Sequence, residues 1–443
     1  CEAFLGPMGY DAVQVSPVVE NSVVEGRPWY ERYQPVSYRV ENRSGDREAF
    51  AEMVRRCGAA GVEIYVDAVI NHMTGVYSGT GTAGTVFGEY DYPGLYAYDD
   101  FHHCGLTQGD DIVDWEDPVQ VRDCELLNLA DLDTSREPVR DRIVEHLNDL
   151  VSLGVAGFRI DAARHMDPDE LGMILARVEG DPFVYNEVVD PAPPTWSEMY
   201  YDKGLVTEFQ FSRVVGEVFR DGALSRLHGP GSIWETTPFV PSAEALIFVD
   251  NHDNQRGQHG PGGHVVTHRD GALYDLAAAF MLAYPYGTAR LMSSYAFRAD
   301  EDGPPTVPGT EEIAPVHAAD GVDCGRGRWV CEHRRASIAP MVRFRTVTAG
   351  APVEHWWTDG VHGIAFSRGD RGLIAINRDP GAPLSATLRT GLPEGTYCDV
   401  LDGSLVDGAC TGSTFTVAAD GTTSVNVPPM RAAATHAEAR IPR

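Results

Sequence analysis

Short apolar runs typical of buried parallel strands alternate with amphipathic helical stretches through the first three quarters of this chain. Repeated strand-then-helix units of this size favour an α/β barrel, because each parallel strand needs a crossover to reach the next. We predict parallel strands at 11–17, 63–69, 155–161, 182–187, 205–209, 245–250 and 288–294. Amphipathic helices are predicted between several of these strands, for example over 47–59, 137–153 and 273–283.

Two regions interrupt the alternation. Residues 72–132 are rich in Gly, Tyr and Asp and form a long excursion, which indicates a functional insertion or a small subdomain. From about residue 351, short alternating strands with frequent Gly turns are typical of an antiparallel β-sandwich. The predicted domains are therefore a barrel in two parts, an insertion and a sandwich, over 1–71 with 133–350, 72–132 and 351–443.

The composition limits the partners of the chain. Its 443 residues are 43% apolar but contain no apolar run long enough to span a membrane. The 65 acidic and 35 basic residues give a formal charge of -30, which argues against nucleic acid and favours a neutral or cationic partner. An acidic surface also keeps a protein in solution without indicating any function.

The eight cysteines are even in number and contain no CxxC pair, which favours structural disulfides over a zinc or redox site. Two pairs are close in sequence and are candidates for local bridges, Cys324 with Cys331 and Cys398 with Cys410. Disulfides imply export, so we expect a secreted protein. No signal peptide precedes Cys1, and we expect that such a signal was removed or not recorded.

Three acids lie at the ends of predicted strands: Asp161 after GFRI, Glu187 after VYN, and Asp253 in VDNHD. In a barrel the C-terminal ends of the strands share one mouth, so these acids are expected in a single cleft. Glycoside hydrolysis needs such a set, with one carboxylate as nucleophile and a second kept protonated by its environment. Taken singly, each acid is equally compatible with a helix cap or a salt bridge.

Four short segments resemble the conserved regions of the α-amylase family of glycoside hydrolases, in that family's order and spacing. They are DAVINH (67–72), GFRIDAARH (157–165), NEVVD (186–190) and FVDNHD (248–253). Further segments, among them RPWYERYQPVSY, VRDCELLNLADL and YPYGTARLMSSY, resemble its chloride-dependent branch of animal and some actinobacterial enzymes. The resemblance covers essentially the whole chain.

This resemblance implies a retaining enzyme that cuts internal α-1,4 links of starch, glycogen and malto-oligosaccharides. It assigns the nucleophile to Asp161, the acid/base to Glu187 and the stabilisation of the transition state to Asp253. The fold that it implies is a (β/α)8 TIM barrel with an inserted B domain and a C-terminal antiparallel β-sandwich. From the charge and the apolar runs we also expect no binding to nucleic acid or membranes, and we expect a monomer.

Calcium is the first ion that the resemblance implies. Its ligands would be Asn71, Asp131 and the backbone carbonyls of Arg122 and His165, and oxygen donors of this kind suit a hard cation. Taken singly, Asn71 also fits a turn and Asp131 also fits a position beside a helix.

Chloride is the second implied ion, with Arg159, Asn251 and Arg290 as its ligands. Arg290 is the discriminating residue, because family members without chloride also carry an arginine at the position of Arg159. An anion near Glu187 would raise the pKa of that carboxyl toward the working pH. The alternative for Arg290 is an ion pair with a barrel acid.

The resemblance also assigns residues to substrate binding and to the disulfides. Those assigned to substrate are Trp29, Tyr30, Tyr33, Gln34, His72, Arg159, Arg164, His165 and His252. The implied disulfides are Cys1–Cys57, Cys104–Cys124, Cys324–Cys331 and Cys398–Cys410. The stretch 257–263 resembles a loop that closes over substrate, although a plain surface turn also uses glycines.

The chain departs from the family in a few places. It begins inside the expected first barrel helix, so the first barrel strand is expected to be missing from it. Arg164 stands where many members have lysine, and Tyr30 where animal enzymes have tryptophan. Two other interpretations stay open: a transglycosylase or exo-acting α-glucosidase of the same fold, and a catalytically inactive relative that serves as a binding or scaffold protein.

Overall fold

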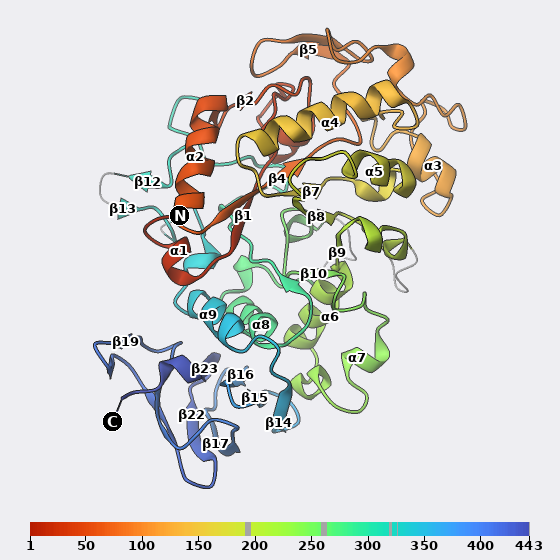
Figure 1. Cartoon of the computed structure of the whole chain (residues 1–443). Helices are drawn as coiled ribbons and strands as arrows, with labels where there is room; N and C mark the ends of the chain where they lie inside the picture. Colours follow the sequence, from red (N-terminus) through yellow and green to blue (C-terminus); the bar gives the residue numbers. More distant parts are fainter. Residues whose placement is uncertain (191–195, 258–263, 319–320, 326, 443) are drawn as a thin grey trace. The chain divides into compact units, whose positions relative to one another are not determined.

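The computed structural model describes residues 1–190, 196–257, 264–318, 321–325 and 327–442 (Figure 1). It divides into two compact units. The first contains the described residues of 1–207 and 296–322, and the second contains those of 208–295 and 323–443.

Five neighbouring parallel strands form the frame of the first unit, and several lie side by side in red to yellow-green in Figure 1. They are β1 (Ala12–Val15), β4 (Glu63–Ala68), β7 (Gly157–Ile160), β8 (Phe183–Asn186) and β9 (Leu205–Thr207). The register pairs Ala68 with Ile160 and Ile160 with Asn186. The residues that follow these three partners therefore leave the sheet at one edge.

Side-chain caps mark the beginning of some helices of the first unit. The N-cap carboxylate of Asp46 accepts a hydrogen bond from the Ala49 N–H at 2.9 Å, and Asp167 caps its own helix with Pro168 in the first turn. The helices are α1 (Leu5–Met8), α2 (Arg47–Ala59), α3 (Pro118–Asp123), α4 (Glu137–Ser152) and α5 (Pro168–Leu175). The amphipathic helices α2 and α4 bury one face each.

The segment between β4 and α4 is mostly irregular. Its regular elements are α3, a short 3-10 helix (Tyr98–Asp100) and the hairpin of β5 (Ser78–Thr80) with β6 (Val86–Gly88). A further hairpin, β2 (Glu41–Asn42) with β3 (Gly45–Asp46), precedes α2. An isolated bridge between His72 and Asp131 joins the two ends of the irregular segment.

The first unit also takes in residues from much later in the chain. The Trp29 N–H donates to the Glu301 carbonyl at 3.2 Å, and the Arg27 guanidinium binds the Glu311 carboxylate at 2.5 Å. This late segment ends with a short hairpin of β12 (His317–Ala318) and β13 (Gly321–Val322).

The second unit begins with helices and two short parallel strands. Its helices are α6 (Phe209–Arg220), α7 (Ile233–Thr236), α8 (Ala272–Ala283) and α9 (Ala339–Val347). The strands β10 (Ala245–Ile247) and β11 (Thr288–Ala289) pair in parallel, with Leu246 opposite Thr288.

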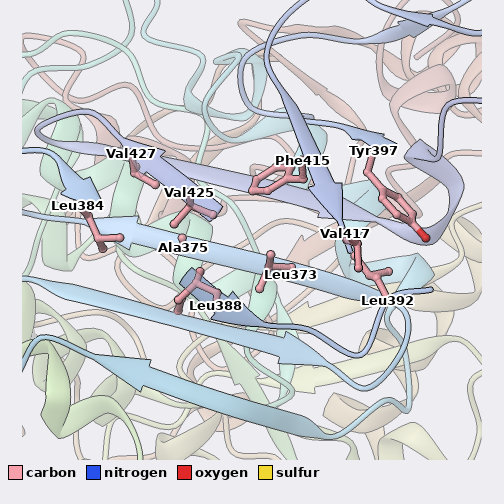
Figure 2. Close-up of a cluster of buried hydrophobic side chains, with 11 residues drawn as sticks. Leu373, Ala375, Leu384, Leu388, Leu392, Tyr397, Phe415, Val417, Val425 and Val427 are labelled. Atoms are coloured by element: carbon pink, nitrogen blue, oxygen red, sulfur yellow. The ribbon is translucent and has the colours of Figure 1, made fainter. Parts of the chain in front are cut away.

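Antiparallel strands form the rest of the second unit, in blue in Figure 1. One sheet contains β14 (Val353–Thr358), β15 (Gly363–Arg368), β16 (Gly372–Asn377) and β23 (Arg431–His436). The other pairs are β17 (Leu384–Arg389) with β22 (Thr422–Val427), β18 (Gly395–Cys398) with β21 (Thr414–Val417), and β19 (Leu405–Val406) with β20 (Ala409–Cys410). Figure 2 shows Leu373 and Ala375 of β16 in one cluster with Leu384, Val425 and Phe415, so alternating apolar residues form the buried core.

All four implied disulfides are confirmed, and none of the eight cysteines is free. Within the described ranges, no helix has both the length and the apolar composition that a membrane span needs.

Candidate active site

Two of the predicted acids leave adjacent strands of the first unit. Asp161 directly follows β7 and Glu187 directly follows β8. The Asp161 N–H donates to the Ala68 carbonyl at 3.0 Å, and the Glu187 N–H donates to the Ile160 carbonyl at 2.9 Å. The strand ladder therefore continues through both acids and fixes their backbones at one edge of the sheet.

Arg159 joins the acids of this edge. It lies two residues before Asp161 on β7, so both side chains point to the same face of the sheet. Its guanidinium binds Asp67 at 2.5 Å and Asp161 at 2.7 Å through Nη1, and it binds Glu187 through Nη2. Because Arg159 is only 1% exposed, one buried cation holds three carboxylates together.

Burial sets the ionisation of this group. Removal from water raises the pKa of Asp161 well above its usual range, and the Arg159 guanidinium opposes this shift. Burial likewise raises the pKa of Asp67, again against the effect of Arg159. Burial disfavours the charged form of Arg159, but its three carboxylates outweigh burial and raise its pKa.

The residue after Asp161 has a backbone conformation that is uncommon outside glycine. Ala162 has a φ of 50°, in the left-handed region. Its N–H donates to Glu187 Oε2 at 3.0 Å. The turn thereby holds the carboxylate of Glu187 beside the residue that follows Asp161.

Tyr33 and His72 lie next to the same group. The Tyr33 hydroxyl donates to Asp67 Oδ2 at 2.8 Å, and the Arg159 guanidinium lies over the Tyr33 ring at 5.8 Å. His72 Nε2 lies 3.1 Å from the Tyr33 carbonyl, and burial lowers the pKa of His72 to about 4. A neutral imidazole is therefore present here near neutral pH.

The other predicted aromatic residues surround Tyr33. The rings of Trp29 and Tyr33 meet edge to face at 5.8 Å, and Tyr30 packs against Trp29 at 6.0 Å. The Gln34 side chain instead accepts a hydrogen bond from the Thr74 hydroxyl at 2.7 Å.

Asp253 lies in the second unit, directly before the 3-10 helix Asn254–Arg256, and is 5% exposed. Its carboxylate accepts a hydrogen bond from the Asn251 amide at 3.3 Å and lies 3.3 Å from His252 Nε2. The Asn251 side-chain oxygen accepts from the N–H groups of Asp253 and Asn254. Asn251 therefore orients the turn that carries Asp253.

Arg290 directly follows β11 in the second unit. Its N–H donates to the Ile247 carbonyl at 2.8 Å, which continues the pairing of β10 and β11. Its guanidinium lies 4.9 Å from the centre of the Phe248 ring.

Arg164 and His165 follow the Asp161 turn and bind mainly backbone groups. The two terminal nitrogens of Arg164 donate to the carbonyls of Val189 and Trp115. His165 Nδ1 lies 2.9 Å from the Val121 carbonyl, and burial lowers the pKa of His165 to about 4. These contacts join the Asp161 turn to α3.

Among the residues implied for calcium, Arg122 lies on α3 and His165 lies on the Asp161 turn, while Asn71 and Asp131 lie at the two ends of the irregular segment. The Asn71 amide donates to Asp131 Oδ1 at 3.1 Å, and Arg122 lies one residue after Val121 on α3. Asp131 also binds His102 Nδ1 at 2.7 Å, and burial raises the pKa of Asp131 to about 7. The predicted loop 257–263 lies outside the described residues after its first position, Gly257.

The sequence reasoning missed Asp67 as a site residue. The signal was available, because Asp67 is an acid near the C-terminal end of a predicted strand. Trp115, which was also not predicted to lie beside the site residues, is 42% exposed and meets the His165 ring edge to face at 6.0 Å. It lies in the irregular insertion, where no periodic pattern indicates which aromatic residue faces outward.

Comparison with known proteins identifies the family of this chain. Residues 357–438 match the model of the α-amylase C-terminal all-beta domain. An α-amylase-related protein of Drosophila teissieri is 47% identical over 437 residues, which are 94% of this chain and 85% of that protein.

Solved structures are similar over nearly the whole chain. Wild-type α-amylase I of Eisenia fetida matches with a TM-score of 0.89 at 40% identity, over 98% of this chain and 93% of that one. A variant of the same enzyme, solved in complex with maltohexaose, matches with the same TM-score of 0.89 and the same coverage at 39% identity. The predicted TIM-barrel class with a C-terminal β domain is thereby confirmed. The chain belongs to the α-amylase family and is a glycoside hydrolase.

Proposed function

We propose that this enzyme hydrolyses internal α-1,4-glucosidic bonds of starch, glycogen and malto-oligosaccharides with retention of configuration. The observation that carries the proposal is the buried Arg159 that binds both Asp161 and Glu187. Two carboxylates on one guanidinium stay close together, and retaining glycosidases use the closer of the two known carboxylate spacings. The maltohexaose complex of the Eisenia fetida relative supports the substrate class.

In the first step, the Asp161 carboxylate forms a bond to the anomeric carbon while the glycosidic C–O bond breaks. Glu187 gives its proton to the departing oxygen. In the second step, a water molecule gives a proton to Glu187 and attacks the same carbon, which releases Asp161. Arg159 supports this chemistry because its charge favours the ionised form of Asp161, which burial disfavours.

The other residues of the proposal bind substrate and stabilise charge. Asp253 stabilises the positive charge that develops on the sugar ring. His72 and His252 hydrogen-bond the sugar next to the scissile bond, which suits the neutral His72 imidazole. Trp29 and Tyr33 stack on glucose units through their apolar faces.

Calcium fits the oxygen-rich donors of Asn71, Asp131 and the backbone carbonyls of Arg122 and His165. Asp131 is 2% exposed, so a cation beside it would offset the cost of burying its charge. Calcium here would stabilise the insertion, which carries Arg122 and Asp131.

Chloride would bind to the guanidinium groups of Arg159 and Arg290 together with the Asn251 amide. The same anion would favour the protonated form of Glu187, which the first step needs. Four disulfides support the further proposal that the protein is secreted, and we propose that it acts as a monomer.

The test compares Asp161→Asn with wild type in the release of reducing ends from soluble starch, with and without chloride. We expect a loss of roughly 10³-fold or more in the variant, because the nucleophile is gone. The matched control is Asp399→Asn, which changes a buried acid of the sandwich that accepts hydrogen bonds from the Leu401 and Ala434 N–H groups.

An endo-acting enzyme also lowers iodine staining quickly, while an exo-acting enzyme releases reducing ends with little loss of staining. Full activity of Asp161→Asn would overturn the assignment of the nucleophile. Starch binding without hydrolysis by the folded wild type would indicate a carbohydrate-binding relative instead.

A further inference from the structure

Three ionisable side chains from separate segments of the second unit meet in its interior. Asp250 lies three residues after β10, His268 begins a 3-10 helix (His268–Asp270), and Glu332 begins another (Glu332–Arg334). One ligand atom of each lies within 4.8 Å of those of the other two. Asp250 is 1% exposed and Glu332 is 0% exposed, so both carboxylates are removed from water.

The oxygens of these carboxylates are poorly satisfied. Among the described residues, neither oxygen of Asp250 accepts a hydrogen bond of normal geometry, although the Tyr274 hydroxyl lies beside it. Glu332 Oε2 accepts from the Ser294 N–H at 2.7 Å, while Oε1 has no such donor within the described part of the chain. Glu332 Oε1 lies 3.7 Å from His268 Nδ1. Two neighbouring buried carboxylates with so few donors cost free energy unless a cation accompanies them.

The arginines around this cluster are engaged with other groups. Arg335 binds the Asp275 carboxylate at 2.6 Å, and Arg290 lies over the Phe248 ring. The positive charges of Arg335 and Arg290 lower the pKa of Asp250, but burial and the nearby Glu332 charge raise that pKa well above its usual range. Burial and the mutual repulsion of the two acids therefore outweigh the two nearby arginines.

We propose that Asp250, His268 and Glu332 bind a first-row divalent cation such as zinc or manganese, a site separate from those of the proposed function. Two carboxylate oxygens and one imidazole nitrogen are donors that such ions accept, whereas calcium prefers oxygen alone. Ligand atoms at about 2.0–2.2 Å from one ion can be at most roughly 4.4 Å apart, so small side-chain movements complete the set. A metal ion binds the neutral form of an imidazole, and binding at His268 would therefore release a proton if the ring were charged.

Such an ion would link three loops that have no shared strand or helix. Asp250 directly precedes Asn251, whose side chain orients the Asp253 turn. Glu332 directly follows Cys331 of the Cys324–Cys331 disulfide. The cation would hold these loops to the segment of His268.

The experiment uses the full chain, stripped with EDTA and returned to saturating calcium so that a calcium site does not take up the probe. Zinc is then titrated by calorimetry, and cobalt is added as a spectroscopic substitute whose visible absorption reports its ligands. We expect one zinc per chain, with at least tenfold weaker binding and a weaker cobalt band in His268→Gln. The matched control is His146→Gln, which changes a buried histidine of the first unit and is expected to bind zinc like wild type.

Equal zinc affinity in His268→Gln and His146→Gln would overturn the proposal, as would the absence of zinc binding by wild type. Asp250→Asn is the second variant, because it keeps the shape of the side chain. A more stable Asp250→Asn with unchanged zinc affinity would mean that the two acids share a proton instead of an ion. Zinc binding is measured without starch, so failure here is distinct from failure of the proposed activity.

Discussion

His146 is a buried histidine of α4 that makes stability depend on pH. Its ring stacks on Tyr38 with the centroids 4.3 Å apart, and burial lowers its pKa to about 4 from an ordinary value near 6.5. The unfolded chain therefore binds a proton between pH 6.5 and 4 that the folded chain does not bind. The contribution of His146 to the free energy of unfolding is therefore fully present above pH 6.5, and it is lost as the pH falls toward 4.

We expect His146→Phe, which keeps the stack but does not titrate, to lose less stability on acidification. The free energy of unfolding is measured with urea for both proteins at pH 8 and at pH 4. Between these pH values, we expect wild type to lose up to about 3 kcal/mol more than the variant. Parallel pH profiles of the two proteins would contradict the prediction.

Single residues also show what the sequence could predict about the site. Asp161 and Glu187 could be predicted because each ends the apolar run of a predicted strand, and Asp253 because it lies in the polar stretch that follows one. The pairing of Arg159 with Asp67 could not be predicted, because it depends on the register between β4 and β7. The sequence pattern of the two strands does not fix that register. The cluster of Asp250, His268 and Glu332 has no local motif at all, since its members come from three loops.

At the scale of elements, α6 packs too closely for any side chain at Gly216. A Cβ at this position would lie 2.0 Å from the His264 carbonyl oxygen, which is a backbone atom that cannot rotate away. We expect Gly216→Ala to lower the free energy of unfolding by about 1–3 kcal/mol, measured by urea unfolding.

Gly58→Ala is the matched control for this prediction, since Gly58 also lies inside a helix but a Cβ there would meet no atom within 4 Å. That substitution should stabilise the protein by about 0.5–1 kcal/mol, because alanine favours helix over glycine. Similar effects of the two substitutions would show that close packing of α6 is not the cause.

The elements were predicted best where local chemistry marks their ends. The predicted helix 47–59 agrees with α2 because Asp46 caps it. The predicted strand 205–209 ends earlier, at Thr207, because Glu208 instead caps α6 by accepting from the Gln210 N–H. Of the predicted strand 288–294, only β11 (Thr288–Ala289) is formed. At the far end of the predicted range, the Ser294 N–H donates to the Glu332 carboxylate and not to a neighbouring strand.

At the scale of the whole molecule, the four disulfides close loops of very different length. Cys1–Cys57 spans 56 residues and Cys398–Cys410 spans 12. Replacing both cysteines of a pair by serine should cost about 4 kcal/mol for the long loop and about 3 kcal/mol for the short one, if chain entropy dominates. Urea unfolding of the two double variants tests this order, and a larger loss from the short loop would indicate native-state packing as the main effect.

The late segment of the first unit has a consequence for synthesis on the ribosome. The Arg27–Glu311 ion pair joins residues that are 284 positions apart, and residues 208–295 of the second unit are translated between them. At about 5–20 residues per second, Arg27 waits roughly 15–60 s for its partner. The first unit therefore cannot finish folding before residues 296–322 have been translated. Until then, the early segments of the nascent chain lack part of their native contacts and have to stay unaggregated.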